Sequence, residues 1–403
     1  MISDSALTTE NEGPASAEIP VAVSMKNVDV LFGPRKAQMN ALRLLDSANT
    51  REQILQETGV VLGVANASLD VPLGSISVLM GLSGSGKSSL LRCVNGLNTV
   101  TRGTLSVRTP DGMVDVASCK KRVLKSLRRQ NLAMVFQQFG LLPWATVREN
   151  IGFGLSVRGE PESKIKQSID EQLELVGLQA WADKSIDSLS GGMQQRVGLA
   201  RAFATDADIL LMDEPFSALD PLIREHLQDE LLALQSRLKK TILFVSHDLD
   251  EAFKLGNQVS IMESGHIVQT GEVQDIVDNP ANDYVRRFVA NINPLSVLTA
   301  RSVMRAIEHN STDYHHQPSG LSLKLIEGCP VSAEIHGKSI DIAEDRNSLI
   351  DAEELICVEL DTPIRELLGL ASMHTTPIVV LNKKGMLCGL LQARDLCAQL
   401  SEG

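Results

Sequence analysis

The sequence lacks the long apolar run that a membrane-spanning helix needs. Crossing a bilayer takes roughly 18 to 20 consecutive apolar residues, and no run in the 403 residues approaches that length. Residues 1–24 contain no Lys or Arg, so the basic start of a secretory signal peptide is missing as well. We therefore expect a chain that stays inside the cell and does not cross the membrane.

Paired cysteines and an excess of basic charge are also lacking. The six cysteines form no C-x-x-C pair and show no metal-ligand spacing, which favours free thiols in a reducing compartment. The formal net charge of −12 opposes the basic face on which nucleic-acid binders depend, so we expect no nucleic-acid partner. A hydrophobic content of 43% over this length is enough for two or three domains.

The N-terminal part predicts a tail, a strand and a helical insertion. Residues 1–23 have the Ser, Thr, Ala and Pro content of a disordered tail, and alternation over 21–32 indicates a strand. Phe32 ends that strand, where its ring could stack on an adenine or pack in the core. Over 34–59 we expect helices, because T-R-E-Q at 50–53 forms a capping box. The pattern does not reveal what this insertion does.

A glycine-rich loop carries the strongest chemical signal in the chain. The apolar run 75–80 predicts a buried strand, and residues 81–88 then match the phosphate-loop pattern G-x-x-x-x-G-K-[ST] at every fixed position. Glycines there can turn backbone N–H groups inward toward an anion at a helix N-terminus. The expected ATP-binding residues of the loop are Gly81, Ser83, Gly84, Ser85, Gly86, Lys87, Ser88 and Ser89. Lys87 would reach the β- and γ-phosphates, and Ser88 would bind Mg²⁺.

Polar side chains follow further apolar strands, at the edge where ligands bind in parallel α/β sheets. The strand 209–212 delivers Asp213, suited to Mg²⁺, and Glu214, suited to a general base. Gln137 after strand 133–136 could orient a Mg²⁺ ligand or the attacking water, or could cap its strand. His247 follows strand 241–245, where it could contact a γ-phosphate or be structural.

The region around 144–200 reads as a helical subdomain inserted in an α/β core. Its last helix opens with L-S-G-G-M-Q, whose hydroxyl and glycine N–H groups make a second helix N-terminus able to bind an anion. The residues of this motif are Leu189, Ser190, Gly191, Gly192, Met193 and Gln194. Asp220 caps the next long helix, which begins at Pro221.

Asn293–Pro294 is the expected domain boundary. Residues 301–350 look mixed and polar, with His309, His315 and His316 read as a solvated loop. Residues 363–400 are more ordered, with an expected helix, two strands and a closing helix.

These motifs, in this order, resemble the nucleotide-binding subunit of an ATP-binding cassette (ABC) transporter. The resemblance covers about residues 24–290. It implies a P-loop NTPase fold of the α/β class: a RecA-like core with an antiparallel β subdomain and a helical subdomain. It also implies a homodimer in which ATP and Mg²⁺ on one subunit's phosphate loop are covered by Ser190–Gly192 of the other. Glu214 would activate water, His247 would hold the γ-phosphate, Gln137 would sense the membrane subunit and Asp220 would link the two sites.

A narrower likeness points to importers of quaternary amines. It rests on LFGP with the insertion and QETG at 56–59, on VFQQFGLLPW at 135–144, on FSALDPLIREHLQDELL at 216–232 and on NPANDYV at 279–285. These segments are most similar to the choline branch, with the glycine betaine/proline betaine branch next. The likeness implies transmembrane permease subunits, a periplasmic or lipid-anchored binding protein, and a peripheral place on the cytoplasmic face of a bacterial plasma membrane.

The segment 295–403 resembles one half of a paired cystathionine-β-synthase (CBS) type module, a small α+β regulatory domain. The likeness lies in TPIRELL, PIVVL and GLLQARDL, although Gln392 replaces the usual Thr or Ser. A soluble ABC ATPase of translation or DNA repair is the alternative to a transporter subunit. Such proteins normally carry two cassettes or long coiled-coil arms, and neither is present in this sequence.

Overall fold

The structure, a computed structural model, describes residues 20–290, 298–307, 313–316, 319–326, 329–340, 342, 355–374 and 376–401. Its backbone contacts divide the chain into two compact units, one formed by residues up to 77 with 84–245 and 264–266, the other by 78–83, 246–263 and 267 onward. Most of the expected tail, the boundary Asn293–Pro294 and His309 lie outside the described residues. Val21–Val23, included in the expected tail, belong to the first strand.

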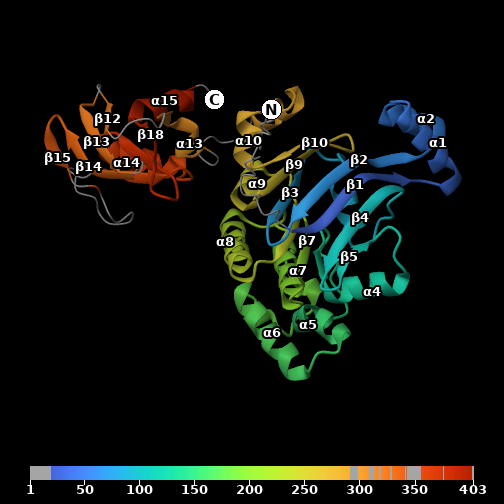
Figure 1. Cartoon of the computed structure of the whole chain (residues 1–403). Helices are drawn as coiled ribbons and strands as arrows, with labels where there is room; N and C mark the ends of the chain where they lie inside the picture. The colour runs from blue at the N-terminus through green and yellow to red at the C-terminus, as the bar shows by residue number, and fades with distance from the viewer. Residues whose placement is uncertain are drawn as a thin grey trace, which may run out of the picture. The chain divides into compact units, whose positions relative to one another are not determined.

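An antiparallel sheet of the first unit contains the N-terminal strand. Its order is β2-β1-β4-β5, and it is visible in blue and teal in Figure 1. Most apolar side chains of β1 and β2 are buried, and the hairpin β4–β5 turns between the paired residues Thr109 and Gly112. The bounds are β1 Val21–Phe32, β2 Val61–Pro72, β4 Arg102–Thr109 and β5 Gly112–Asp115.

The helical insertion consists of α1 (Arg35–Asp46) and α2 (Arg51–Thr58). The expected capping box is confirmed: the Thr50 hydroxyl accepts from the Gln53 N–H, and the Gln53 side chain accepts from the Thr50 N–H. Gly59 ends α2 with φ 67°, the left-handed conformation that glycine adopts most easily.

A six-stranded sheet holds the expected buried strands, in the order β10-β9-β3-β8-β7-β6. Strands β6, β7 and β8 pair in parallel, so their carboxyl ends share one edge. Every residue of β3, β7 and β8 is buried, which matches their continuous apolar sequences. The bounds are β3 Ile76–Met80, β6 Leu132–Val135, β7 Ile209–Asp213, β8 Thr241–Val245, β9 Gln258–Glu263 and β10 His266–Gly271.

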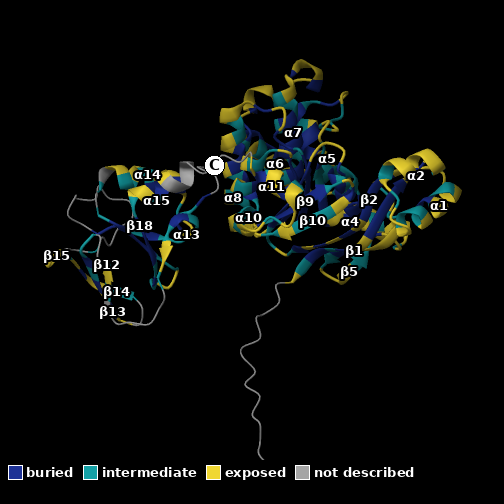
Figure 2. Cartoon of the chain, turned by 90° about the horizontal axis from the view of Figure 1, so that it is seen from above, coloured by how far each residue is buried: buried dark blue, intermediate teal, exposed yellow. Residues whose placement is uncertain are grey.

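Helices make up the rest of the first unit. The helical subdomain, green in Figure 1, is confirmed as α5 (Val147–Arg158), α6 (Glu162–Leu175) and α7 (Gly191–Ala204). A capping box joins Thr146 and Glu149 at the start of α5. Helices α3 (Lys87–Val94), α4 (Lys121–Gln130) and α8 (Pro221–Leu238) also belong to this unit. No residue of α3 is exposed, whereas α1 and α2 carry many exposed residues, shown in yellow in Figure 2.

In the second unit, three short helices precede the residues left undescribed at 291–297. They are α9 (Leu249–Leu255), α10 (Val273–Asp278) and α11 (Asp283–Val289). Two of them are capped by side chains: Asp248 accepts from the Glu251 N–H and Asn282 from the Val285 N–H.

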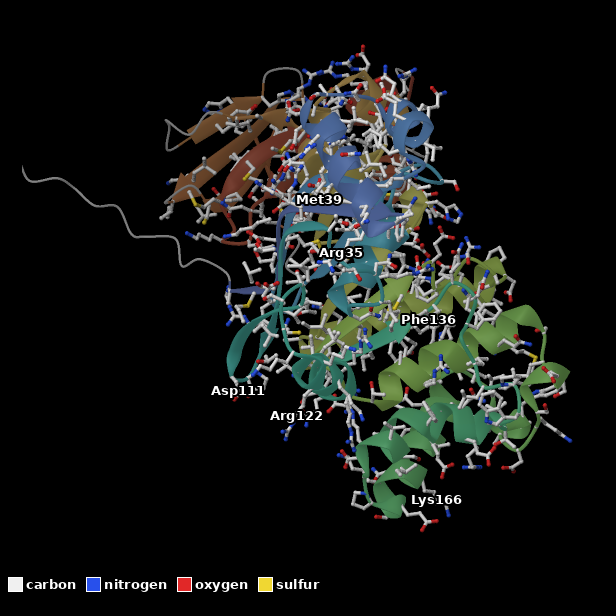
Figure 3. The ribbon with its side chains drawn as sticks, turned by 90° about the vertical axis from the view of Figure 1, so that its right-hand side faces the viewer. Arg35, Met39, Asp111, Arg122, Phe136 and Lys166 are labelled. Atoms are coloured by element: carbon white, nitrogen blue, oxygen red, sulfur yellow. The ribbon has the colours of Figure 1, made fainter. Side chains whose placement is uncertain are left out.

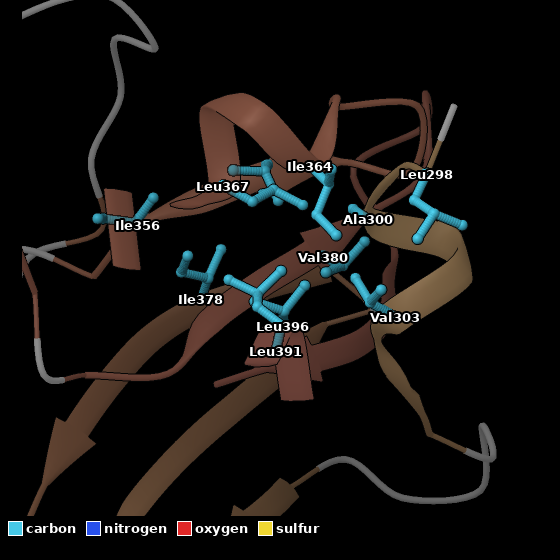
Figure 4. Close-up of a cluster of buried hydrophobic side chains, with 11 residues drawn as sticks. Leu298, Ala300, Val303, Ile356, Ile364, Leu367, Ile378, Val380, Leu391 and Leu396 are labelled. Carbon is cyan, nitrogen blue, oxygen red and sulfur yellow. The ribbon is translucent and has the colours of Figure 1, made fainter. Parts of the chain in front are cut away.

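The C-terminal segment contains two four-stranded sheets; the sequence predicted two strands of one of them and none of the other. The expected strands β17 (Ile378–Leu381) and β18 (Leu387–Leu391) form a sheet in the order β11-β18-β17-β16. Figure 4 shows its apolar side chains packed with those of helices α13 (Ala300–Val303), α14 (Ile364–Met373) and α15 (Ala393–Ser401). The remaining strands of this sheet are β11 (Arg305–Ala306) and β16 (Cys357–Glu359).

The expectation of a polar, mixed region over 301–350 was wrong for its described part. An antiparallel sheet in the order β12-β13-β14-β15 lies there, and Leu321, Leu323 and Leu325 pack in a core with residues of β17 and β18. His315 and His316 lie in β12, not in a loop, and no cluster of three metal-binding His, Cys, Asp or Glu side chains occurs among the described residues. The bounds are β12 Asp313–His316, β13 Leu321–Ile326, β14 Cys329–Ile335 and β15 Lys338–Ile340.

Candidate functional site

The phosphate loop runs from β3 into α3, as the strand–loop–helix pattern predicted. Gly81, Gly84 and Gly86 have φ of 141°, 79° and 105°, values that side chains disfavour and glycine accepts. Gly86 stands at the N-cap of α3 without a capping side chain, so the first N–H groups of that helix face the loop.

Two buried polar groups in the loop fit an anion. The Ser85 hydroxyl is buried and has no hydrogen-bond partner among the described residues. Lys87 is only 5% exposed, and burial lowers the pKa of its ammonium, although the charges of Glu214 and Asp213 oppose that shift. A buried hydroxyl without a partner and a desolvated cation are both stabilised by phosphate oxygens, so the residues present suit a nucleotide triphosphate.

Asp213 ends β7 in full burial and is held by two side chains. The Ser88 Oγ donates to one carboxylate oxygen at 2.7 Å, and the Arg92 Nη2 donates to the other at 2.9 Å. A hydroxyl and a carboxylate within hydrogen-bond distance make an oxygen donor set of the kind that Mg²⁺ takes. The sequence predicted Ser88 and Asp213 together but did not predict Arg92, whose position on α3 one turn after Ser88 was the available signal.

Glu214 has an unusual backbone for a residue with a side chain. Its φ is 50°, in the left-handed region, and its N–H donates to the Val245 carbonyl at 3.0 Å. The Gln137 amide donates from Nε2 to the Glu214 carboxylate at 3.0 Å. The structure therefore joins two residues that the sequence placed after different strands, β6 and β7.

Helix α7 contributes two side chains that sequence reasoning missed. Gln195 is fully buried, donates to the Glu214 carbonyl at 3.2 Å and accepts from the Ala218 N–H at 3.0 Å. Arg201 donates to the carbonyls of Phe139 and Gly140, in the turn that follows Gln137. The signal in the sequence was a polar residue on an otherwise apolar helix face, where a buried group needs a partner.

The other predicted residues lie at element ends. Ser190 is the N-cap of α7 and accepts from the Met193 N–H at 3.4 Å. Asp220 caps α8 through the Ile223 N–H at 3.1 Å. His247 comes two residues after β8 ends. Gly191 and Gly192 begin α7, Leu189 is buried before it, and Gln194 bonds back to the Ile186 and Leu189 carbonyls.

Phe32 keeps 40% of its surface exposed at the end of β1. Its ring lies over Gly63, since a Cβ built on Gly63 would meet a ring carbon at 2.6 Å. The ring is thus neither in the core nor fully in solvent.

Comparison with known proteins shows the family of this chain. The model of the family described as ABC transporter matches residues 64–217. The glycine betaine/carnitine transport ATP-binding protein GbuA of Listeria monocytogenes is 38% identical over 94% of this chain and 97% of its own length. The glycine betaine transport ATP-binding protein OpuAA of Bacillus subtilis is 39% identical over 95% of this chain and 93% of its own.

The chain belongs to the ATP-binding subunits of ABC transporters. A solved structure agrees: the dimeric ATP-binding cassette MJ0796, in a post-hydrolysis state bound to ADP and Pi, is 26% identical with a TM-score of 0.53. The match covers 62% of this chain and 98% of the MJ0796 chain. The ABC ATPase fold predicted from the sequence is therefore confirmed, and this ABC subunit is an ATPase with ATP and Mg²⁺ as its cofactors.

A groove of about 340 Å³ opens on the first unit of the ABC subunit. Its apolar lining includes Phe136, labelled in Figure 3, and the half-exposed Phe153 and Val157 of α5. Arg201 and Gly140 line it too, so the groove borders the turn after Gln137. Among the described residues, no helix has the length and apolar character that crossing a membrane requires.

Proposed function

We propose that this ABC subunit hydrolyses ATP to drive the import of a quaternary amine through separate permease subunits. The observation that carries the proposal is similarity along nearly the whole chain, C-terminal segment included, to subunits named for glycine betaine and carnitine transport. The trimethylamine N-oxide transport ATP-binding protein TmoW of Pelagibacter ubique, 41% identical over 81% of this chain, extends the same chemical class. A soluble ABC ATPase of translation or DNA repair is not favoured by these relatives.

The residues of the site have the following proposed roles. The loop 81–89 binds the phosphates, with Lys87 on the β- and γ-oxygens. Ser88, Asp213 and Gln137 hold Mg²⁺, which when bound neutralises charge on the phosphate oxygens. Glu214 takes a proton from the attacking water. The support is geometric: Ser88 touches Asp213, and Gln137 touches the Glu214 carboxylate.

Four further assignments complete the proposed site. Phe32 stacks on the adenine, for which its half-exposed ring on Gly63 is suitable. His247 contacts the γ-phosphate from the end of β8. The motif 189–194 covers the nucleotide of a second copy of the chain, and Asp220 links the two sites of that dimer. The dimeric state of MJ0796 supports the homodimer.

The partners follow from the same family. We propose that the groove beside Gln137 receives a segment of a permease subunit, because its half-exposed apolar side chains adjoin a residue of the site. The subunit then works peripherally on the cytoplasmic face of a bacterial plasma membrane. A periplasmic or lipid-anchored protein would bind the solute, as the sequence resemblance implies.

The test of the function is uptake. Cells with and without this subunit are given labelled choline, glycine betaine and carnitine, with Glu214→Gln as the catalytically impaired control. The sequence resemblance favours choline, whereas the names of the relatives favour glycine betaine and carnitine. Loss of uptake of any of the three supports quaternary-amine import and identifies the substrate; unchanged uptake of all three refutes the proposal.

A further inference from the structure

The insertion 34–59 has a built interface with the first sheet. Ala41 of α1 and Ile54 of α2 are fully buried in a cluster with Leu31 and Leu62, which belong to β1 and β2. Figure 3 labels Arg35 and Met39 on α1, and Met39 is more than half exposed, so only one face of the helix is covered. One apolar face against the sheet holds the insertion in a single place.

Polar contacts tie α1 to the same sheet. The Gln38 amide donates to the Leu31 carbonyl at 3.1 Å and to the Gly33 carbonyl at 3.0 Å. At the other end of α1, Asp46 pairs with Arg102 of β4 at 2.9 Å. These contacts keep the start of α2, only a few residues later, at a defined position.

The first residue of α2 touches the phosphate loop. The half-buried Arg51 donates from Nη1 to the Gly84 carbonyl at 2.7 Å, across 33 residues of sequence. The capping box between Thr50 and Gln53 fixes the turn that carries Arg51. Gly84 lies inside the loop with φ 79°, and a Cβ there would meet nothing within 4 Å, so packing alone does not set its backbone.

A hydrogen bond to this carbonyl orients one peptide of the loop. In a trans peptide the C=O of Gly84 and the N–H of Ser85 point in opposite directions. Fixing the carbonyl on Arg51 therefore turns the Ser85 N–H to the other side of the loop, away from the insertion. Glycine permits the flipped peptide at little cost, so without this bond the loop would sample both orientations.

We propose that Arg51 is a positioning residue for nucleotide binding, by which the insertion preorganises the Gly84–Ser85 peptide of the phosphate loop. This inference rests on the loop being the nucleotide site. The insertion then acts on ATP affinity through the loop, and Arg51 contributes most before the nucleotide is bound. Preorganisation raises affinity because the ordering of the loop no longer has to accompany binding.

The experiment uses the full chain with Arg51→Ala and Arg51→Lys, and Arg43→Ala as the matched control on the exposed face of α1. ATP affinity, KM and kcat are measured with the thermal midpoint and with amide hydrogen exchange of residues 81–89 without nucleotide. We expect Arg51→Ala to weaken ATP binding and raise KM about 5- to 10-fold, with kcat within about twofold and faster exchange at Ser85. Arg51→Lys, which keeps one donor, should recover part of the affinity.

The outcomes separate this inference from the function it rests on. Unchanged affinity and exchange in Arg51→Ala, or an equal change in Arg43→Ala, overturns the role of Arg51. Lys87→Ala is run beside them: normal ATP affinity in that variant means that the loop is not the nucleotide site at all. If Arg51→Ala proves unstable, Arg51→Met keeps the aliphatic packing and is expected to show the same loss of affinity.

Discussion

Glu214 is fixed by its backbone as much as by its side chain. Its N–H, its carbonyl and its carboxylate bond to Val245, Gln195 and Gln137 respectively, although its φ of 50° is unfavourable for a residue with a Cβ. A conformation of this kind persists only where the surroundings impose it, and such positions concentrate at functional sites. The carboxylate is therefore held in one place before ATP arrives.

Replacing Glu214 by Gln removes the charge and the proton acceptor while keeping the shape and the backbone bonds. We expect ATP binding to remain, turnover to fall by at least about 10²-fold, and ATP-bound dimers to accumulate. Phosphate release and size-exclusion chromatography with ATP measure this. Glu225→Gln, at an exposed position of α8, is the control; normal hydrolysis by Glu214→Gln would place the base elsewhere.

Cys93 on α3 gives a pH prediction. Burial raises the pKa of its thiol from 9.0 to about 12, and the thiol donates to the Ser89 carbonyl at 3.3 Å. Because the unfolded chain releases this proton at lower pH than the native chain, stability is full below pH 9 and falls as the pH rises toward 12. Between pH 8 and pH 10.5 the free energy of unfolding should therefore fall by about 2 kcal/mol less in Cys93→Ala than in the wild type.

Urea unfolding at the two pH values measures this change. The packing cost of the smaller alanine side chain is the same at both pH values, so it does not affect the change with pH. Cys397→Ala, at an exposed thiol, should keep the wild-type dependence. An equally steep fall in Cys93→Ala would show that the thiol is not responsible.

At the scale of the element, α7 links three parts of the site. Its N-cap is Ser190, Gln195 bridges Glu214 and Ala218, and Arg201 holds the turn after Gln137. A helix is stiff over this length, so a shift of the turn by a partner in the adjacent groove would reach the Glu214 backbone. Helix α7 therefore contacts both the turn beside the groove, through Arg201, and the backbone of the proposed base, through Gln195.

Arg201→Ala should lower both stability and turnover. Burial lowers the pKa of the Arg201 guanidinium, and its loss leaves the carbonyls of Phe139 and Gly140 without these donors, at about 1–3 kcal/mol. Arg196→Ala is the matched control, since Arg196 on the same helix bonds to the Val176 carbonyl at 2.9 Å, away from the turn. We expect the two variants to lose similar amounts of unfolding free energy, measured with urea, but Arg201→Ala to lose more ATPase activity than Arg196→Ala. Equal ATPase rates in the two variants would contradict a link through α7.

For the whole molecule, the proposed composite site makes a mixing prediction. Ser190→Arg blocks the covering motif, and Lys87→Ala weakens nucleotide binding by the phosphate loop. Each variant chain alone should therefore be inactive. A mixed dimer pairs one intact loop with one intact motif and should regain part of the activity of a single site. ATPase assays on dimers shown to be mixed test this, and no recovery would count against a shared site.

The C-terminal segment, which we propose is a regulatory CBS-like domain over 295–403, should be separable from the ATPase. Two of its buried clusters consist only of residues from 298 onward, so the segment has hydrophobic cores of its own. A chain stopped after Asn293 should keep its ATPase activity. Transport compared with full length across salt concentrations then distinguishes a switch, which shifts the salt threshold, from a scaffold; loss of all ATPase activity would show the boundary to be wrong.

The sequence by itself determined the features whose signal is local. Examples are the capping boxes at Thr50 and Thr146, the glycines of the phosphate loop, the buried strand that ends in Asp213 and the buried strand that ends two residues before His247. These features are predicted from neighbouring residues, because the interactions that produce them act over one turn or one strand. Ordered motifs then identified the ABC fold, since several such signals in one order rarely coincide by chance.

Only the tertiary structure decided which side chains meet. Three hydrogen bonds join residues that lie 19 to 121 positions apart in the sequence: those from Arg92 to Asp213, from Gln195 to Glu214 and from Arg51 to Gly84. The sheet of β12–β15 was not predicted from the sequence, although Leu321, Leu323 and Leu325 alternate, because the residues that cover its apolar face, among them residues of β17 and β18, are distant in the sequence. A hydrogen bond between residues distant in the sequence produces no repeating pattern of residues, because it needs only one donor at one position.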